Sequence, residues 1–555
     1  MRSSLSLVIC VMFVSAASPW GAPIRAGSDG DGKLCGTVAN SPGSDWSFEP
    51  AFTLRIKSLD GLIADMRHLY QKAGREEEGK AFEKAMQART GPKGLEGVDT
   101  TMPLGFSAAV DPKLDRSPMF LMLPVADETT FLKFVASLGN EPRKQDDGSY
   151  RVTVEGVPLI SMAMFRFAHG YAYVTLRVTD ATILPTADKL PKPEIGLGKG
   201  TATASMTIHV SRVPMSVRKL AVSFLGLQWG AMKDEEKDPV GAAAIDDATA
   251  LLRSLLEEGE RMTIQLDLDP KKEIFTLDTS VTPRKGTAMA KDVNALGAMR
   301  SAVAGLLVKD ALLSGVSHVL LPEQMKKAAN AVLDDTFKKG IDQLQEHERE
   351  VIEPLIKAAL PTLRAGGFDG AVQMSGPSKN GKYRFVVGLG LKDGSKLEQA
   401  VKAALKNIPE KSRRGILVDA EKAGVVPIHR VDQSKADVKT RELLGDGPAY
   451  FAFRDDALFL AAGESALEAL RETLAVKTVT ATPLRLQVGI NALAVLLSLV
   501  DPTMKDAPQA AKEAFKGKVS DRVTLEITGG DQVAMRLTMP TAVLTFAGAL
   551  DRLRK

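Results

Sequence analysis

Histidine is the side chain that most often performs acid–base or metal chemistry near neutral pH, and this chain has six histidines. None of them forms the HExxH zinc motif, because Val351 stands where the second histidine would follow His347. No GxSxG sequence marks a nucleophilic serine. We predict surface or structural roles for all six: His68 and His347 in charged helices, His169 in a turn, His209 in a strand, His318 in an apolar helix and His429 beside a strand end.

Three glycines follow a predicted strand and lead into a predicted helix with GxGxxxG spacing, which is one residue from the dinucleotide-binding pattern. They are Gly388, Gly390 and Gly394. A matching strand and helix earlier in the chain have no glycine at these points, so the turn does not require them. We predict no nucleotide site.

Paired acids and a serine–lysine pair are the remaining candidates for catalysis. Asp267 and Asp269 lie in LDLDPKKE, which is typical of a strand, a turn at Pro270 and a second strand. Ser216 and Lys219 form SxxK, but the RTG triplet at 89–91 precedes them, in the reverse of the order used by penicillin-binding enzymes. We predict no catalytic, cofactor-binding or metal-binding residues and no cofactor.

The elements that would position a site occur twice along the chain. Stretches in the first half each match a stretch about 260 to 290 residues later, with the same alternation or helical spacing. The matches are FSAAV at 106–110 with FDGAV at 368–372, FLMLPVA at 120–126 with FVVGLGL at 385–391, GVPLI at 156–160 with GVVPI at 424–428, FRFAHGYAY at 165–173 with FAFRDDALF at 451–459, MTIHV at 206–210 with LRLQV at 484–488, and RMTIQL at 261–266 with RVTLEI at 522–527.

These patterns predict an α+β fold of two tandem copies, each a mainly antiparallel sheet with helices packed on one face. Asp127 and the segment Ser395–Glu398 are predicted helix caps. Charged segments at 62–89 and 324–363 are predicted amphipathic helices. Segments 185–200, 229–241 and 433–447 are predicted loops, and because they differ between the copies we expect any copy-specific function there.

The first residues are typical of a secretory signal: a charged start, an apolar run at 5–14 and small residues before a cleavage point. Residues 18–47 are predicted to be a flexible linker, residues 48–300 the first repeat and residues 301–555 the second, after a signal peptide at 1–17. Only Cys35 would remain after cleavage, so we expect no internal disulfide. Export to the periplasm or the extracellular space is the predicted location.

The composition of the chain bears on two further possibilities, a nucleic-acid partner and a membrane span. A net charge of +4 from 72 basic and 68 acidic residues, with 5% aromatic residues, argues against a nucleic-acid partner. No apolar run after the leader has the length of about 20 residues that a membrane span needs, so no integral span is expected after signal cleavage.

The segments IKSLDGLIADMRHL at 56–69, TGPKGLEGVDTTMPLG at 90–105 and AYFAFRDDALFLAAGESAL at 449–467, together with the leader, resemble large exported proteins of planctomycete-type bacteria. That resemblance implies an exported protein with a duplicated α+β fold, and no particular activity. We therefore expect a non-enzymatic exported protein that binds a ligand or an envelope partner. Three alternatives remain. One is a lipid or lipoprotein carrier with a concave sheet groove, and another is a hydrolase of envelope polymers using acids such as Asp267 or Asp455. The third is a purely structural or assembly component, which would need a large flat apolar patch instead of a groove.

Overall fold

The computed structural model describes the chain from residue 48 to residue 553, except for 91–94, 115–116, 138–140, 154–161, 178–183, 307–310, 409–412, 414, 435 and 517–519. Residues 48–555 form one compact unit. The predicted signal peptide, the linker with Cys35 and the GVPLI segment lie outside the described residues.

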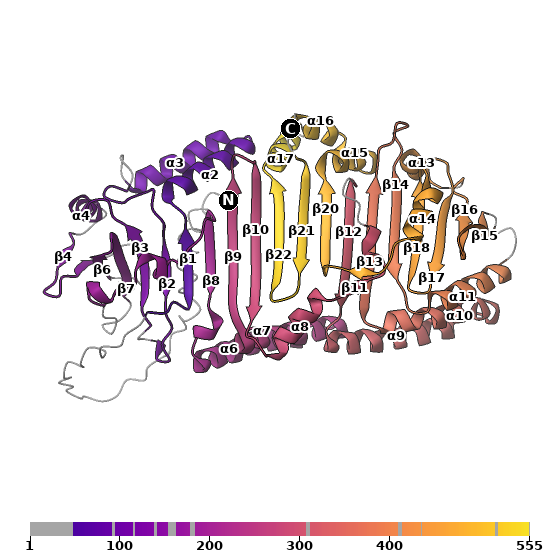
Figure 1. The fold of residues 1–555 in the computed structure, drawn as a ribbon, viewed down its shortest axis with the longest axis horizontal. Coiled ribbons are helices and arrows are strands. Elements are labelled where there is room, and N and C mark those ends of the chain that lie inside the picture. Colours follow the sequence, from indigo (N-terminus) through magenta and orange to yellow (C-terminus); the bar gives the residue numbers. More distant parts are fainter. Residues whose placement is uncertain are drawn as a thin grey trace. The chain divides into compact units, whose positions relative to one another are not determined.

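Within these residues, twenty strands form one antiparallel sheet (Figure 1). From one edge to the middle, the pairings give β4 (Arg143–Lys144), β5 (Tyr150–Thr153), β6 (Met162–Ala168), β7 (Tyr171–Arg177), β3 (Met119–Pro124), β2 (Leu104–Ala108), β1 (Phe52–Ile56), β8 (Ala204–Ile208), β9 (Gly259–Asp269) and β10 (Ile274–Pro283). We call these strands the first half of the sheet.

The magenta strand β10 pairs with the yellow strand β22 (Figure 1). The second half continues from there to the other edge as β22 (Val533–Pro540), β21 (Arg522–Thr528), β20 (Leu484–Gly489), β12 (Leu313–Leu320), β13 (Gly367–Ser375), β14 (Arg384–Gly390), β18 (Ala457–Gly463), β17 (Ala449–Arg454), β16 (Val426–Val431) and β15 (Ile416–Ala423). A small second sheet pairs β11 (Arg300–Ser301) with β19 (Val479–Thr480).

The predicted α+β class with a mainly antiparallel sheet is confirmed. The predicted hairpins also form, because β6 pairs with β7, β17 with β18 and β9 with β10 in antiparallel register. Asp127 caps its helix by accepting the Thr130 N–H at 2.7 Å.

Two rows of helices run along the two ends of the strands (Figure 1). One row contains α3 (Glu76–Thr90), α2 (Leu59–Lys72), α17 (Ala542–Leu553), α16 (Ala507–Ala514), α15 (Ile490–Val500) and α13 (Val438–Leu444). The other contains α6 (Met215–Glu235), α7 (Pro239–Glu258), α9 (Glu323–Gln343), α10 (Glu346–Arg364) and α11 (Gly394–Asn407), with α8 (Ala288–Gly297) beside α7. The predicted charged helices at 62–89 and 324–363 belong to these rows.

Several local predictions were wrong. Most of segment 229–241 is helical, because α6 extends to Glu235 and Asp238 caps α7 immediately afterwards. Part of segment 433–447 forms α13, which Asp437 caps. The segment Ser395–Glu398 is not a capping box, since α11 begins at Gly394 and Glu398 binds other residues. His318 lies in a strand, β12, where β13 and β20 supply partners on both sides.

One line of directly opposite residues crosses the sheet and identifies one of its faces. Starting in the first half it passes Tyr173, Met122, Gly105, Arg55, Ser205, Gln265, Asp278, Arg536, Glu526, Arg485, Val316, Ala371, Gly388 and Phe459. Since neighbouring residues of a strand point to opposite faces, these side chains share one face, the Arg55 face. Their strand neighbours, such as Leu277, lie on the other, the Leu277 face.

Both faces are covered toward the edges of the sheet. On the Leu277 face, Phe131 of α4 (Glu128–Ser137) packs on Phe165 and Ala172, and Glu398 of α11 contacts His429. On the Arg55 face of the second half, α14 (Ala466–Leu474) and residues 302–306 form a buried cluster with Val316 and Phe459. Helices therefore contact both faces of the second half, an arrangement more elaborate than the predicted single covered face.

Candidate functional site

Six central strands form the middle of the sheet: β8, β9, β10, β22, β21 and β20. None of the helices in the described part of the chain lies over the middle of these strands, which have two different faces (Figure 1). On the Leu277 face these strands present many apolar side chains that are partly exposed, with Leu268 buried and the polar Thr279 between Ile264 and Met535. The partly exposed ones include Met206, Ile264, Leu266, Phe275, Leu277, Met535, Leu537, Leu525, Ile527, Leu484 and Leu486. We call this set the central apolar surface, and an exposed apolar set of this size is typical of a binding surface.

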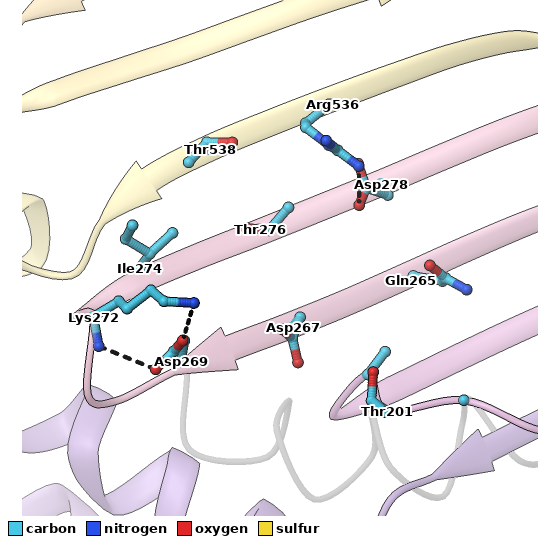
Figure 2. Close-up of a pocket in the computed structure, with 12 residues that line it drawn as sticks. Thr201, Gln265, Asp267, Asp269, Lys272, Ile274, Thr276, Asp278, Arg536 and Thr538 are labelled. Carbon is cyan, nitrogen blue, oxygen red and sulfur yellow. Dashed lines mark hydrogen bonds and ion pairs between the residues drawn. The ribbon is translucent and has the colours of Figure 1, made fainter.

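On the Arg55 face the same strands present polar and charged side chains. Asp278 and Arg536 form an ion pair at 2.6 Å where the two halves of the sheet meet. This pair lines a pocket of about 540 Å³ that also includes Gln265, Asp267 and Lys272 (Figure 2).

Two of the acids proposed from the sequence lie in this pocket, and each has a structural partner. Asp269 accepts hydrogen bonds from the Lys271 and Lys272 N–H groups and pairs with the Lys272 ammonium at 3.1 Å (Figure 2). These contacts with Lys272 hold the pKa of the Asp269 carboxyl below its usual range. Asp269 therefore closes the β9–β10 turn, as predicted for a hairpin.

Asp267 shares Thr203 with another acid, Asp65 of α2. The Thr203 N–H donates to Asp267 at 3.3 Å, and the Thr203 hydroxyl donates to Asp65 at 2.9 Å. Burial raises the pKa of Asp65 and the nearby Asp267 charge adds to the rise, against the lowering by the Thr203 hydrogen bond. Asp455, the other acid considered for hydrolysis, lies in the β17–β18 turn of the second half, where it accepts from Ser395.

Two neighbouring pockets of about 650 and 470 Å³ lie on the Arg55 face of the first half. Both are lined by Glu194, Leu197, Gly198 and Lys199 of the predicted copy-specific segment 185–200, which here contains the short helix α5 (Pro193–Gly196). The smaller pocket is also lined by Arg55, His169 and Tyr171. The Tyr171 hydroxyl donates to the Pro103 carbonyl at 2.8 Å, while a ring nitrogen of His169 lies 3.2 Å from the Leu190 carbonyl.

Arg55 is a functional candidate that the sequence reasoning missed. Arg55 is only 7% exposed, although Thr53, the next residue on the same face of the strand, is also polar. Its only sequence signal is a charge among alternating residues of a short strand, which is ordinary at a solvated face. Burial lowers the pKa of the Arg55 guanidinium.

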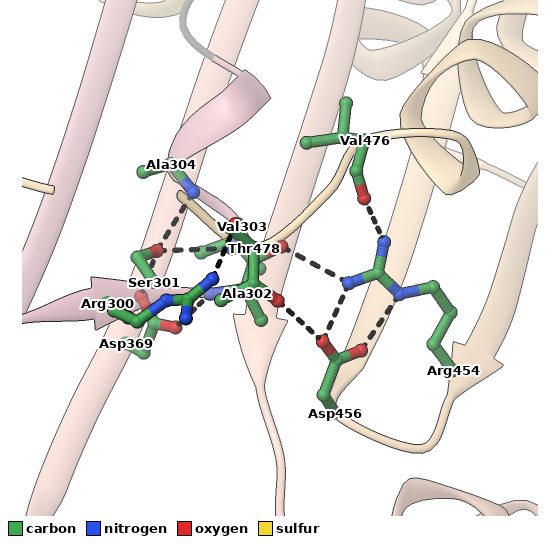
Figure 3. Close-up of polar contacts among 10 residues, drawn as sticks. All are labelled: Arg300, Ser301, Ala302, Val303, Ala304, Asp369, Arg454, Asp456, Val476 and Thr478. Atoms are coloured by element: carbon green, nitrogen blue, oxygen red, sulfur yellow. Dashed lines mark hydrogen bonds and ion pairs between the residues drawn. The ribbon is translucent and has the colours of Figure 1, made fainter. Parts of the chain in front are cut away.

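Counted outward from the β10–β22 pair, β12 holds the place in the second half that β1 holds in the first, and Val316 of β12 lies on the line of opposite residues as Arg55 does in β1. We call Val316 the mirror position of Arg55, and the space over it is filled. Val316 is 2% exposed and packs in the apolar cluster with Val303, Leu306 and Phe459. Asp369 holds the covering segment by accepting from the Ser301 hydroxyl at 2.6 Å and from the Ala302 N–H at 2.9 Å (Figure 3).

A second set of contacts, around Arg454, also holds the covering segment, because the Arg454 guanidinium donates to the Ala302 carbonyl at 3.4 Å. Arg454 forms an ion pair with Asp456 at 2.8 Å and also donates to the Val476 carbonyl (Figure 3). Asp456 accepts in addition from the Thr478 hydroxyl at 3.3 Å. The second half is therefore closed over Val316 by a connected polar network.

The glycines of the GxGxxxG sequence serve this packing. A Cβ on Gly388 would lie 2.8 Å from Leu306 and 2.9 Å from Val303, and one on Gly394 would lie 2.0 Å from the Arg454 carbonyl oxygen. Gly390 similarly gives room to Asp369. Close packing of side chains and backbone thus accounts for these glycines.

One group of metal-ligand side chains lies close together within the described residues: Glu398, Asp419 and His429. Lys402 lies among them, with its Nζ 2.7 Å from both carboxylates. The Asp419 N–H donates to His429 Nδ1 at 3.1 Å, and His429 Nε2 lies 3.3 Å from Glu398. The ammonium supplies the positive charge between the acids, and His429 Nδ1 already accepts a hydrogen bond, so these contacts tie α11 to the sheet.

The other residues considered from the sequence are dispersed. Ser216 and Lys219 are exposed on α6, and His347 is exposed on α10. His209 lines the pocket of about 650 Å³, and His318 lies 3.3 Å from Asp369.

Comparison of the chain with protein-family models, curated proteins and solved structures finds no match. Among the helices of the described residues, none combines the length and the apolar character needed to cross a membrane. We therefore infer the function of the protein from its surfaces and pockets.

Proposed function

We propose that this protein is an exported, non-enzymatic carrier that binds an apolar ligand, such as the acyl chains of a lipid, on the central apolar surface. The observation that supports this most directly is the set of partly exposed apolar side chains on six adjacent strands, with helices only at the strand ends. Burying apolar surface contributes about 25 cal/mol per Å², so acyl chains would gain affinity along the whole surface. The leader at 1–17 and the envelope location remain part of the proposal.

We also propose that the sheet is built from two copies of one module, with the boundary near residue 300. Outward from the β10–β22 pair, the strands on the two sides follow in corresponding chain order, which supports the proposal. The mirror positions along the Arg55 face provide the residue equivalences used below.

Carrier function can be tested with the chain lacking residues 1–17, by titrating a fluorescent fatty acid and by native mass spectrometry of protein isolated from its own envelope. A double variant, Leu266→Asn with Leu277→Asn, removes two opposed side chains from the central apolar surface. We expect it to bind the probe at least about tenfold more weakly, because two buried contacts are lost.

The matched control is Gln265→Asn with Thr276→Asn, which changes the same two strands on the opposite face. It should bind the probe like the parent protein. Equal binding by both double variants, or no bound lipid in the native spectra, would count against a carrier.

A further inference from the structure

We propose a second binding site, for a small organic carboxylate, in the pocket of about 470 Å³ that Arg55 lines. This site lies on the Arg55 face, opposite the central apolar surface, and so goes beyond the proposed carrier function. The ligand class is a carboxylate group attached to a small apolar body.

The first argument is the state of the Arg55 guanidinium. The residue is only 7% exposed, and its Nη1 has no hydrogen-bond partner in the described part of the chain. No ion pair joins it to a carboxylate among these residues. A buried charge without a partner is costly, so buried arginines are normally paired, and an oxyanion in the pocket would supply that partner.

Arg166, in the same half, shows the usual arrangement. It is also 7% exposed, yet its guanidinium pairs with the Asp147 carboxylate at 3.0 Å and donates to the Asp147 carbonyl at 2.6 Å. Of these two equally buried arginines, only Arg166 therefore has an acidic partner among the described residues.

The second argument is the charge and polarity of the pocket lining. Three permanent cations, Arg55, Lys192 and Lys199, line it against one carboxylate, Glu194, which leaves a net charge of +2. Exposed lysines at the rim attract an anion, and the flat guanidinium suits the two oxygens of a carboxylate.

The remaining walls define the rest of the ligand. Met102, Pro103, Pro193 and Leu197 line the pocket with apolar atoms. Gly200 lies beside the guanidinium, and a Cβ there would be 3.9 Å from Arg55 Nη1. The loop thus approaches Arg55 closely because it has no side chain at Gly200, and the apolar walls favour an organic body over a bare ion.

The test compares Arg55→Met with Arg166→Met in the chain lacking residues 1–17, using benzoate and inorganic phosphate as probes in calorimetry and thermal unfolding. Benzoate should bind the parent protein saturably and raise its Tm. Arg55→Met should weaken benzoate binding by about 10- to 100-fold. Without benzoate, Arg55→Met should unfold at a Tm no lower than that of the parent, because an unpaired charge has been removed.

Arg166→Met should show the opposite pattern, with a lower Tm and an unchanged benzoate affinity, because it breaks an internal ion pair. Unchanged benzoate binding by Arg55→Met, or no binding by the parent, would overturn the proposal. Binding of phosphate in place of benzoate would overturn the carboxylate assignment. The Leu266→Asn, Leu277→Asn variant should keep its benzoate response, so failure of the carrier proposal and failure of this site give different results.

Discussion

Arg55 in the first half of the sheet and Val316 in the second lie at mirror positions, between corresponding strands. The segments that cover these two residues pack differently. Around Val316, residues 302–306 and α14 close the face with an apolar cluster. Around Arg55, residues 194–200 cover the strand but leave a pocket. One strand arrangement can therefore support either a closed core or a pocket, according to the segment that covers it.

The largest effect is expected for Val316→Arg, which places a guanidinium at the mirror position of Arg55. Val316 is 2% exposed within an apolar cluster and lines none of the pockets described above, so the new charge would have neither a partner nor water. We expect the free energy of unfolding to fall by about 3–5 kcal/mol in chemical denaturation.

The control is Val316→Met, which adds length without charge and should cost about 1–3 kcal/mol by overpacking. If Val316→Arg were as stable as Val316→Met, the second half would have a hidden cavity and the contrast with the first half would disappear.

A smaller effect is expected for Gly388→Ala, which tests how closely the covering segment packs. The mirror residue in the first half is Met122, whereas a Cβ at Gly388 would press on Leu306 and Val303. We expect a loss of about 1–3 kcal/mol in unfolding free energy.

Gly340→Ala is the matched control, because Gly340 lies within α9 with no atom within 4 Å of the added Cβ. It should stabilise the protein by up to about 1 kcal/mol. A neutral Gly388→Ala would mean that residues 302–306 shift easily.

The smallest expected effect is on the pH dependence of stability. It concerns a difference between the two helices that cover the Leu277 face, one in each half of the sheet. In the first half α4 packs on phenylalanines, whereas in the second α11 covers His429, which is 1% exposed. Burial lowers the pKa of His429, against the raising effect of Glu398, so the imidazole stays neutral in the folded protein. In the unfolded chain the same imidazole has a pKa of about 6.5 and takes up a proton below that pH. The unfolded state then binds more protons, and stability should fall as the pH drops below about 6.5.

His429→Gln removes this titration, so unfolding free energy measured between pH 7.5 and pH 5 should decline less steeply than in the parent. His347→Gln, at an exposed position of α10, should leave the slope unchanged. Parallel pH curves for the parent and His429→Gln would show that His429 has the same pKa in the folded and unfolded states, which would contradict the prediction.

Local patterns predicted much of the fold but not its site. Alternation at 165–173 and 261–266 predicted strands that form, and Asp127 predicted a cap that is present. In the two-copy arrangement proposed above, the line of directly opposite residues equates Ser205 with Arg485, and therefore Met206 with Leu486 instead of Leu484. Sequence similarity alone left this register open because both strands alternate with a period of two.

Local sequence is enough to specify the α+β class, the antiparallel hairpins and the alternation that gives the central strands one apolar and one polar side, because these depend on neighbouring residues. Which polar positions are buried depends instead on the tertiary structure. Arg55 and Thr53 share one side of a short strand, and their burial depends on segments distant in the chain, such as residues 194–200 for Arg55. Pairing across the sheet and coverage by remote segments are long-range properties, and no local pattern around residue 55 encodes them.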